Sequence, residues 1–458
     1  MKLVYQPSDK PKIGQAIVFA IQQLLAIMAA TLVVPIIIGH GMSPVAALFG
    51  AGVGTIVYLL FTKFKSPVFL GSSFAFINSM AAAFSGAVSV SLGYLGLIFG
   101  AVFAGLVYVI IAIIVKYAGV EWINKLMPPQ VIGPTVAIIG LSLAGNAIGD
   151  LQKGDVLDAA GVSVANPLIA VLCGLVTLFV VVLCSTFGKK MMKLIPFIMG
   201  ILAGYAVALI FSIIGKAANV EALMLIDFSY FTALVDGGVG IKTFFALPDF
   251  TFVKAFGAFG ELSGSYIGTV AVAYIPVAFV VFAEHIADHK NISSIIEKDL
   301  LEEPGLDRTL LGDGVGSMAG AFFGGCPNTT YGESVGCVAI TRNASVATIT
   351  TTAIMALLIS FVSPFVAFLD SIPGCVMGGV CITLYGFIAV SGLKMLQKVD
   401  FEDNANLFTA SVILISGIGG MALAIGKVTL TTTACALILG IITNIVLNKF
   451  KKPTSKEE

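Results

Sequence analysis

Apolar runs of about 20 residues follow one another through almost the whole chain, and this pattern constrains the fold more than any other feature. Apolar residues make up 58% of the 458 residues, and charged residues only 11%. The mean hydropathy is +1.03, which excludes an ordinary water-soluble globule. We therefore predict an all-α polytopic membrane protein surrounded by a lipid bilayer. The formal net charge of zero gives no indication of nucleic-acid binding.

Fourteen of these runs are candidate transmembrane segments. The third and the tenth are the weakest, because they are rich in Gly, Ser, Thr and aromatic residues, and they predict half-helices that begin with a short extended stretch. The fourteen runs lie at residues 14–38, 44–62, 67–86, 89–116, 129–148, 166–187, 193–215, 267–289, 309–325, 329–341, 346–369, 372–393, 407–425 and 428–448.

The distribution of positive charge predicts the orientation. An even number of spans places both termini on the same side of the membrane. Of the 25 Lys and Arg residues, five lie in loops on the opposite side: Lys153, Lys216, Lys242, Lys254 and Lys427. The remaining 20 share a side with the termini, and the positive-inside rule makes that side cytoplasmic. We expect a multi-pass protein of the inner cell membrane, with no cleaved signal peptide and with an external loop at 216–265.

The two halves of the chain contain similar motifs in the same order. Gly52-Val53-Gly54 and Gly314-Val315-Gly316 precede the two weak segments, and Pro128-Pro129 and Pro373-Gly374 follow them. Each half holds seven candidate spans, an odd number, so the halves would insert with opposite topology. Inverted repeats with broken segments at matching positions are typical of secondary transporters that bind substrate near mid-membrane. Chance similarity among Gly-rich segments is the alternative.

Ionisable residues interrupt the eighth run near its end. Glu284 and Asp288 are four residues apart and share one helix face, with His285 and His289 on a neighbouring stripe. A carboxylate at mid-bilayer costs about 2.5–3.5 kcal/mol, so such groups usually line a site or a pathway. Glu284 is the deeper candidate, and we expect Asp288 and His289 to be partly hydrated beside Lys290. The alternative is that Glu284 pairs with His285 or a backbone group to hold helices together.

A second lone carboxylate, Glu333, lies in the weak tenth segment. Gly332 permits a close approach of the backbone to a ligand, and N–H groups at the start of a broken helix can donate to it. Together with the rings of Phe74, Tyr331 and Tyr385, the two segments offer acceptors, donors and stacking surfaces. These groups favour a flat heterocycle with alternating N–H and C=O groups. They disfavour a sulfate-like or bicarbonate anion, which two acids would repel.

A metal site is the less favoured interpretation of the charged stretch. His285, Asp288 and His289 have the side-chain types of zinc ligands, but nothing in the sequence completes a coordination shell. We therefore predict no metal, no cofactor and no enzymatic activity. A membrane-embedded metalloenzyme is the remote alternative.

Three motifs resemble those of the nucleobase–ascorbate transporter family. Ile372-Pro373, followed by Val376-Met377-Gly378-Gly379 and Tyr385-Gly386, is similar to the family signature, with Gly374 as a mild departure. Segment 327–333 resembles the tenth span of uracil-type members, and segment 283–289 resembles their eighth span. The resemblance covers nearly the whole chain and is weakest in loop 216–265.

The resemblance implies fourteen spans in a 7+7 inverted repeat that is divided into two domains. A core domain, with spans 1–4 and 8–11, would comprise residues 14–116 and 267–369. A gate domain, with spans 5–7 and 12–14, would comprise residues 129–215 and 372–448. Family members often form homodimers through the gate domain.

The resemblance also implies import of uracil or a related nucleobase together with a proton. The substrate would bind between spans 3, 8 and 10. Glu284 and Glu333 would hold the ring nitrogens. The backbone amides of Phe74 and Gly332 would meet the carbonyl groups, while Tyr331 and Tyr385 would line the pocket.

Proton coupling is expected to involve Glu284, Asp288 and His285. A well-known member of the family carries a pocket histidine where this chain has Asp288, and Gln-His where this chain has Gln22-Gln23, so its histidine relay does not transfer unchanged. A xanthine or purine transporter of the same family is the nearest rival interpretation. An anion exchanger or channel with the same fold is a more distant one.

Overall fold

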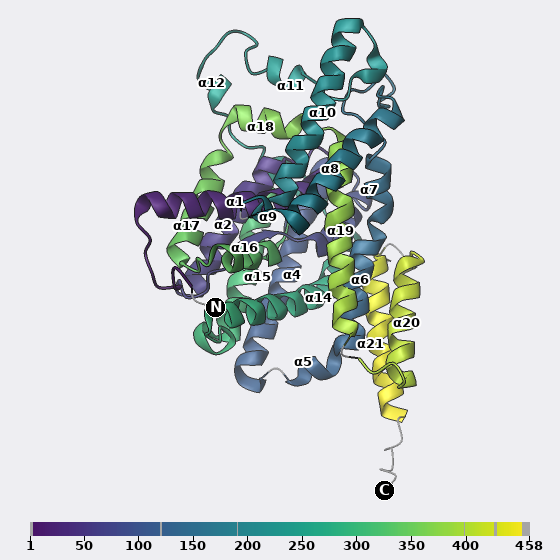
Figure 1. The fold of residues 1–458 in the computed structure, drawn as a ribbon. Coiled ribbons are helices and arrows are strands. Elements are labelled where there is room, and N and C mark those ends of the chain that lie inside the picture. The colour runs from purple at the N-terminus through teal and green to yellow at the C-terminus, as the bar shows by residue number, and fades with distance from the viewer. Residues whose placement is uncertain (1–2, 120, 190, 398, 426–427, 451–458) are drawn as a thin grey trace.

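The computed structural model describes residues 3–119, 121–189, 191–397, 399–425 and 428–450, and helices dominate it (Figure 1). The helices up to residue 218 are α1 (Ile13–Ile38), α2 (Pro44–Phe61), η1 (Phe74–Phe76), α3 (Ile77–Ser85), α4 (Val90–Ala118), α5 (Glu121–Leu126), α6 (Pro129–Ser142), α7 (Ala144–Asp150), α8 (Pro167–Phe187), α9 (Met191–Leu194) and α10 (Pro196–Ala218). Those that follow are η2 (Glu221–Leu223), α11 (Ser229–Thr232), α12 (Ile241–Phe244), α13 (Thr251–Ala255), η3 (Phe259–Glu261), α14 (Gly264–Ile296), η4 (Leu301–Gly305), α15 (Leu306–Gly324), α16 (Gly332–Thr341), α17 (Val346–Ile359), α18 (Ser363–Asp370), α19 (Gly374–Leu396), α20 (Asn404–Ile418) and α21 (Thr432–Phe450). Four strands of three residues each complete the fold: β1 (Leu70–Ser72), β2 (Asn328–Thr330), β3 (Leu423–Ile425) and β4 (Val428–Leu430).

Helices long enough to cross a bilayer account for most of the predicted spans. Within the described residues, nine helical stretches have the length and hydropathy of a membrane span: α1, α2, α4, α6 with α7, α8, α10, α14, α19 and α21. The other five predicted runs coincide with α15 and with the shorter helices α3, α16, α17 and α20. The outer faces of the long helices are apolar. In α4, for example, Leu106, Ile110 and Ile113 are 46–56% exposed. The chain is therefore an integral membrane protein.

Three predicted boundaries are wrong, and two of them have a local cause. The run 346–369 is not one helix, because Pro364 lies in the first turn of a new helix, α18. The run 407–425 ends early, at Ile418, because Gly420 has a φ of +74° and leads into the β3–β4 hairpin. Helix α14 continues to Ile296, beyond the predicted end at residue 289.

The two weak segments meet in the interior, where they form a two-stranded antiparallel sheet. Strands β1 and β2 pair Leu70 with Thr330 and Ser72 with Asn328, although more than 250 residues separate them in sequence. Each strand leads directly into a helix, β1 into η1 and α3 and β2 into α16. Both broken segments thus contain the extended stretch that the sequence predicts.

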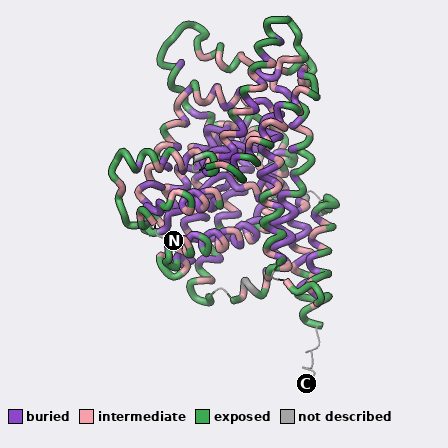
Figure 2. The backbone as a smooth tube through the Cα atoms, in the orientation of Figure 1, coloured by how far each residue is buried: buried purple, intermediate pink, exposed green. Residues whose placement is uncertain are grey.

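Packing divides the helices into two groups (Figure 1). In one group α15 packs along α2 and α4, α14 packs on α3 and α4, and α17 packs on α1 and α2. In the other group α19 packs against α6 and α8, and α20 and α21 lie beside α6. Contacts between the groups are fewer and include those of α14 with α6 and α21. Figure 2 shows buried residues concentrated in the middle of the molecule and exposed residues along its ends and outer faces.

The predicted external loop contains short helices, and α11 and α12 within it lie at the end of the molecule opposite the end of α21 (Figure 1). Elements η2, α11, α12, α13 and η3 fall within it. The loop is anchored to the segment between α17 and α18, where the backbone N–H of Ala246 donates to the carbonyl of Phe361 at 3.0 Å.

Candidate functional site

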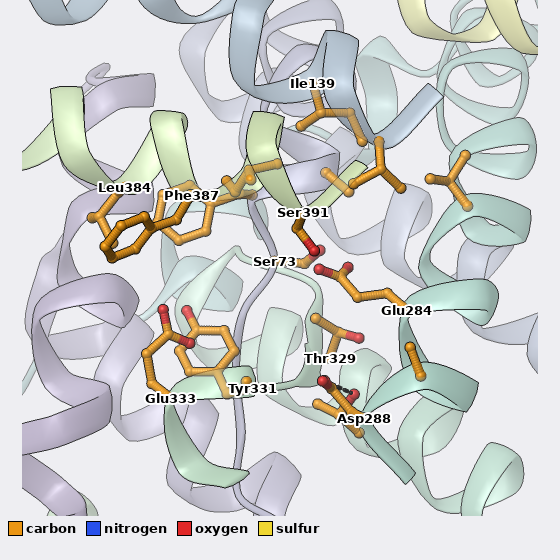
Figure 3. A pocket seen from close by; sticks show the side chains of 18 of the residues that line it. Ser73, Ile139, Glu284, Asp288, Thr329, Tyr331, Glu333, Leu384, Phe387 and Ser391 are labelled. Atoms are coloured by element: carbon orange, nitrogen blue, oxygen red, sulfur yellow. Dashed lines mark hydrogen bonds between the residues drawn. The ribbon is translucent and has the colours of Figure 1, made fainter. Parts of the chain in front are cut away.

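A cavity of about 410 Å³ lies between the two helix groups, beside the β1–β2 sheet. Its size is within the usual range for small-molecule sites. Residues from both broken segments, from α14 and from the helices α6, α10 and α19 line it (Figure 3). They are Ser73, Phe74, Ala75, Val136, Ile139, Phe197, Val280, Glu284, Ala287, Asp288, Asn291, Thr329, Thr330, Tyr331, Gly332, Glu333, Leu384, Phe387, Ile388, Ser391 and Met395.

The two predicted acids reach this cavity from different helices. Glu284 projects from the middle of α14, and Glu333 projects from the first turn of α16. Figure 3 shows them on different sides of the cavity, with Tyr331 beside Glu333. No side chain of the described residues donates a hydrogen bond to either carboxylate. Both therefore have acceptor capacity for a ligand.

The cavity-facing stripe of α14 follows helical periodicity. Val280, Glu284, Ala287, Asp288 and Asn291 recur every three or four residues and all line the cavity. The shared face of Glu284 and Asp288 is thus confirmed.

The prediction that Asp288 and His289 are partly hydrated is wrong. Asp288 is 8% exposed and His289 is fully buried. The physical reason is that α14 continues to Ile296 and remains packed inside the protein beyond the charged stretch, with Ile292 and Ile296 also buried. Thr330 Oγ1 donates a hydrogen bond to Asp288 Oδ2 at 2.8 Å, which fixes this carboxylate against β2.

The start of α16 is a backbone site with little steric hindrance. Its N-terminal cap is Tyr331, in an extended conformation, so the N–H groups of the first turn lack intrahelical partners. Gly332 is exposed to the cavity, and a Cβ placed there would meet only Asp288 Oδ1, at 3.9 Å. Phe74 begins η1 on the other broken segment and also lines the cavity.

The two predicted tyrosines differ in position. Tyr331 lines the cavity, and its hydroxyl donates to the carbonyl of Ser72 at 2.6 Å, which ties the two broken segments together. Tyr385 does not reach the cavity: it is 2% exposed, and its ring packs edge-on against Phe74 at 6.4 Å. The residues of α19 that line the cavity include Leu384, Phe387 and Ser391 instead. Successive residues of a helix are rotated by about 100°, so these side chains point in a different direction from that of Tyr385.

The two histidines of α14 also point away from the cavity. His285 Nδ1 lies 2.6 Å from Asp313 Oδ2, and its Nε2 lies 3.1 Å from Thr309 Oγ1. His289 Nδ1 donates to the carbonyl of His285 at 2.8 Å, and its Nε2 lies 2.7 Å from the hydroxyl of Tyr58. His285, predicted as a proton-coupling residue, thus has no direct access to the cavity.

The three side chains of the disfavoured metal interpretation have separate partners. His285 turns to α15, Asp288 to β2 and His289 to α2, so their side chains do not converge. In the part of the chain that the structure describes, no group of three or more His, Cys, Asp or Glu side chains is arranged to hold a metal.

Several site residues were missed by the sequence reasoning. Asn291 continues the stripe of Glu284 and Asp288, so helical periodicity could have identified it. Asp313 is a lone carboxylate inside the ninth apolar run, and the rule that identified Glu284 applies to it equally. Phe387 and Ser391 carry no local signal, because their position depends on how α19 packs.

Comparison with known proteins supplies independent information. Residues 14–426 match the model of a family described as the permease family. A uracil permease of Bacillus caldolyticus is 38% identical over 97% of this chain and 95% of its own length. A uracil permease of Bacillus subtilis is 36% identical over 98% and 95%, and one of Escherichia coli is 36% identical over 95% and 91%.

Solved structures share the fold at low sequence identity. The transmembrane domain of the cyanobacterial bicarbonate transporter BicA superposes with a TM-score of 0.59 at 14% identity, over 96% of this chain and 99% of that one. The murine anion transporter Slc26a9 gives a TM-score of 0.63 at 11% identity, over 97% of this chain and 69% of that one. At these identities the likeness concerns the fold alone.

Proposed function

Because the chain belongs to the permease family, whose members are nucleobase–ascorbate transporters, we propose that it imports uracil together with a proton. Its relatives are named permeases, so it is a transporter and not an enzyme. The observation that carries the proposal is the pair of carboxylates, Glu284 and Glu333, on different sides of one cavity of about 410 Å³ beside the broken segments.

The binding mode follows from the groups that line the cavity. Uracil offers two ring N–H donors and two carbonyl acceptors in one plane. Glu284 and Glu333 accept hydrogen bonds from the N–H groups, while the backbone N–H groups of Phe74 and Gly332 donate to the carbonyls. The ring of Phe74 and that of Phe387 provide apolar surface for the heterocycle. A ligand of this kind forms hydrogen bonds with the donors and acceptors that line the cavity, and a buried polar group left without a partner would cost free energy.

The architecture that we propose has fourteen spans in a 7+7 inverted repeat, with both termini in the cytoplasm and the protein in the inner membrane. Residues 14–116 and 267–369 form the core domain, and residues 129–215 and 372–448 form the gate domain. The division of the packing into two helix groups supports this assignment, as does the site at their boundary. Alternating access comes from movement of one group against the other. Dimer formation through the gate domain belongs to the same proposal.

Proton coupling is assigned first to Glu284, which both contacts the cavity and lies in the same stripe as Asp288. Asp288 supports it through the shared stripe and through its hydrogen bond from Thr330. His285 acts indirectly, because its ring points to Asp313 while its backbone adjoins Glu284.

Uptake into proteoliposomes with an inward proton gradient tests this assignment. Glu284→Gln keeps the shape of the side chain but cannot exchange a proton, so gradient-driven accumulation of labelled uracil should be lost. Glu302→Gln, an exposed glutamate outside the cavity, is the matched control. Full pH-dependent accumulation by the Glu284→Gln variant would show that this residue does not carry the proton.

The substrate is tested separately by competition. Excess unlabelled uracil should abolish uptake of labelled uracil, whereas xanthine and hypoxanthine should compete weakly. Stronger competition by xanthine would make the chain a purine transporter of the same family. Absence of saturable uptake would favour a channel.

A further inference from the structure

The start of the chain runs alongside the connection between α16 and α17. Residues 3–9, the N-terminal segment, precede α1 and belong to none of the helices. The hydrogen bonds to the connection run from Val4 N–H to the Arg342 carbonyl at 2.8 Å, from Ala344 N–H to the Tyr5 carbonyl at 3.0 Å, from Val346 N–H to the Pro7 carbonyl at 3.1 Å and from Ser345 Oγ to the Asp9 carbonyl at 2.6 Å. Two parts of the chain that are remote in sequence are therefore bonded along their backbones.

The N-terminal segment is itself fixed to α1. The hydroxyl of Tyr5 donates to Gln15 Oε1 at 2.8 Å, and its ring packs edge-on against Phe19 with the ring centroids 6.0 Å apart. Leu3 packs against the hydrophobic core, and Pro7 is buried. The segment thus has a firm base on one helix and holds the α16–α17 connection with its backbone.

The connection depends on this support. Asn343, Ala344 and Ser345 are 5%, 0% and 0% exposed, although connections between helices usually lie at the surface. Arg342, which ends α16, has a φ of +57°, in the left-handed region that a residue with a Cβ rarely adopts. Its carbonyl accepts the bond from Val4 N–H, and Tyr5 N–H is a second, longer donor at 3.4 Å. The N-terminal segment therefore holds the end of α16 in an unusual conformation.

The other end of α16 is the candidate site. The helix has ten residues and is about 15 Å long, with Gly332 and Glu333 in its first turn. A rigid helix that is released at one end tilts at the other, and a binding group has to be held within about 0.5 Å of its productive position. We propose that the N-terminal segment is a positioning clamp, which holds the far end of α16 and thereby orients Glu333 and the first-turn N–H groups toward the ligand.

The clamp affects the orientation of α16 more than its formation. Gln23 Nε2 donates to Ser334 Oγ at 2.6 Å, and Ser334 Oγ accepts from the N–H of Phe69 at 3.2 Å, so the first turn keeps contacts of its own. Without the clamp, α16 should present a correctly aligned site for only part of the time. The apparent affinity for the ligand falls by the same fraction. This effect on uracil rests on the proposed function, whereas the effect on the helix does not.

Val4→Pro tests the clamp, because proline has no backbone N–H to donate to Arg342. Val4 is 58% exposed, so little packing is lost, and Val4→Ala is the matched control that keeps the N–H. Hydrogen exchange of the full-length, detergent-purified protein is measured without any nucleobase. Exchange of residues 332–341 should be faster in Val4→Pro than in the unmodified protein, while residues 374–396 of α19 should be unchanged. Val4→Ala should match the unmodified protein.

Binding of labelled uracil provides the second measurement. Val4→Pro should weaken binding at least about threefold, which corresponds to a competent fraction of about one third, with little change in the thermal midpoint. Deletion of residues 2–9 should change exchange and affinity in the same direction and by more.

Three results would overturn the clamp: unchanged exchange of α16 in both variants, normal uracil affinity despite faster exchange, or equal effects of Val4→Ala and Val4→Pro. Faster exchange of α16 in variants of a protein that binds no uracil even when unmodified would instead refute the proposed substrate. The two failures are therefore distinguishable.

Discussion

Gly71→Ala is expected to damage the site through a single methyl group. A Cβ at position 71 would lie 2.8 Å from Tyr331 Cδ2 and still closer to Cε2 and Cζ. Favourable carbon contacts are about 3.5–4.0 Å, so the ring has to retreat by roughly 1 Å. The hydrogen bond of 2.6 Å from the Tyr331 hydroxyl to the Ser72 carbonyl prevents this movement unless it breaks.

The magnitude follows from these two terms. Overpacking a buried site costs about 1–3 kcal/mol, and the lost hydrogen bond adds about 0.5–1.5 kcal/mol, so the variant should lose roughly 1.5–4.5 kcal/mol of stability. Uracil binding should weaken as well, because Tyr331 directly precedes Gly332 and Glu333. Thermal unfolding in detergent and binding of labelled uracil measure both effects. Gly336→Ala is the matched control, since a Cβ there meets nothing within 4 Å.

A double-mutant cycle shows whether the clash with Tyr331 is the cause. In a Tyr331→Ala background the space is open, so Gly71→Ala should cost about 1 kcal/mol or less, because the lower backbone freedom of alanine in the unfolded chain offsets part of any remaining loss. If Gly71→Ala is as damaging in that background as in the unmodified protein, the steric reasoning is refuted.

Three further predictions concern single side chains. Glu333→Ala should weaken uracil binding at least about tenfold, because a ring N–H of uracil loses its acceptor, which costs about 1–3 kcal/mol. Binding of labelled uracil measures the effect, with Glu302→Ala as the control. Normal binding by both variants would contradict the prediction. Thr330→Val should lower the free energy of unfolding by about 1 kcal/mol, seen as a lower thermal midpoint, because Asp288 loses its 2.8 Å hydrogen bond. Thr350→Val is the control and should cost less, because it removes only a hydroxyl that bonds within its own helix. Asp155 lies in the loop between α7 and α8, where burial, and then Asp227 and Asp370, raise its pKa from its ordinary value to about 7. Its neutral form is therefore favoured in the folded protein, so the stability that it contributes is present at low pH and is lost as pH rises through about 7. Asp155→Asn should flatten the fall in thermal midpoint between pH 5 and pH 8 and should be the more stable variant at pH 8; identical pH profiles would contradict the assignment.

Local pattern was sufficient for part of the site. The spacing of Glu284 and Asp288 predicted a shared helix face, and that face lines the cavity. The composition of the two weak segments predicted extended stretches, and both strands are present. Both features depend only on the spacing of residues along the chain and on residue type, and both can be read from a single sequence.

Rotation and packing of helices could not be predicted in the same way. Tyr385 was expected in the pocket, but the packing of α19 against α6 and α8 turns Leu384, Phe387 and Ser391 toward the cavity instead. His285 was expected to take part in proton coupling. Its ring instead bonds to Asp313, 28 residues further along the chain, and points away from the cavity. Such partners lie on other helices, and a single sequence does not say which helices meet.

The β1–β2 pair shows how a membrane protein can hold extended backbone at its centre. Backbone groups without partners are very unfavourable away from water, so each edge of the sheet needs its own donors and acceptors. Side-chain hydroxyls supply several of them: Thr55 accepts from the N–H of Leu70 at 2.9 Å, Ser317 from that of Asn328 at 2.9 Å, and Ser334 from that of Phe69 at 3.2 Å. Three helices, α2, α15 and α16, thereby fix the sheet in position. We therefore expect the substrate-binding elements to move as one rigid unit during transport. The displacement should occur where the two helix groups meet, along the contacts of α14 with α6 and α21.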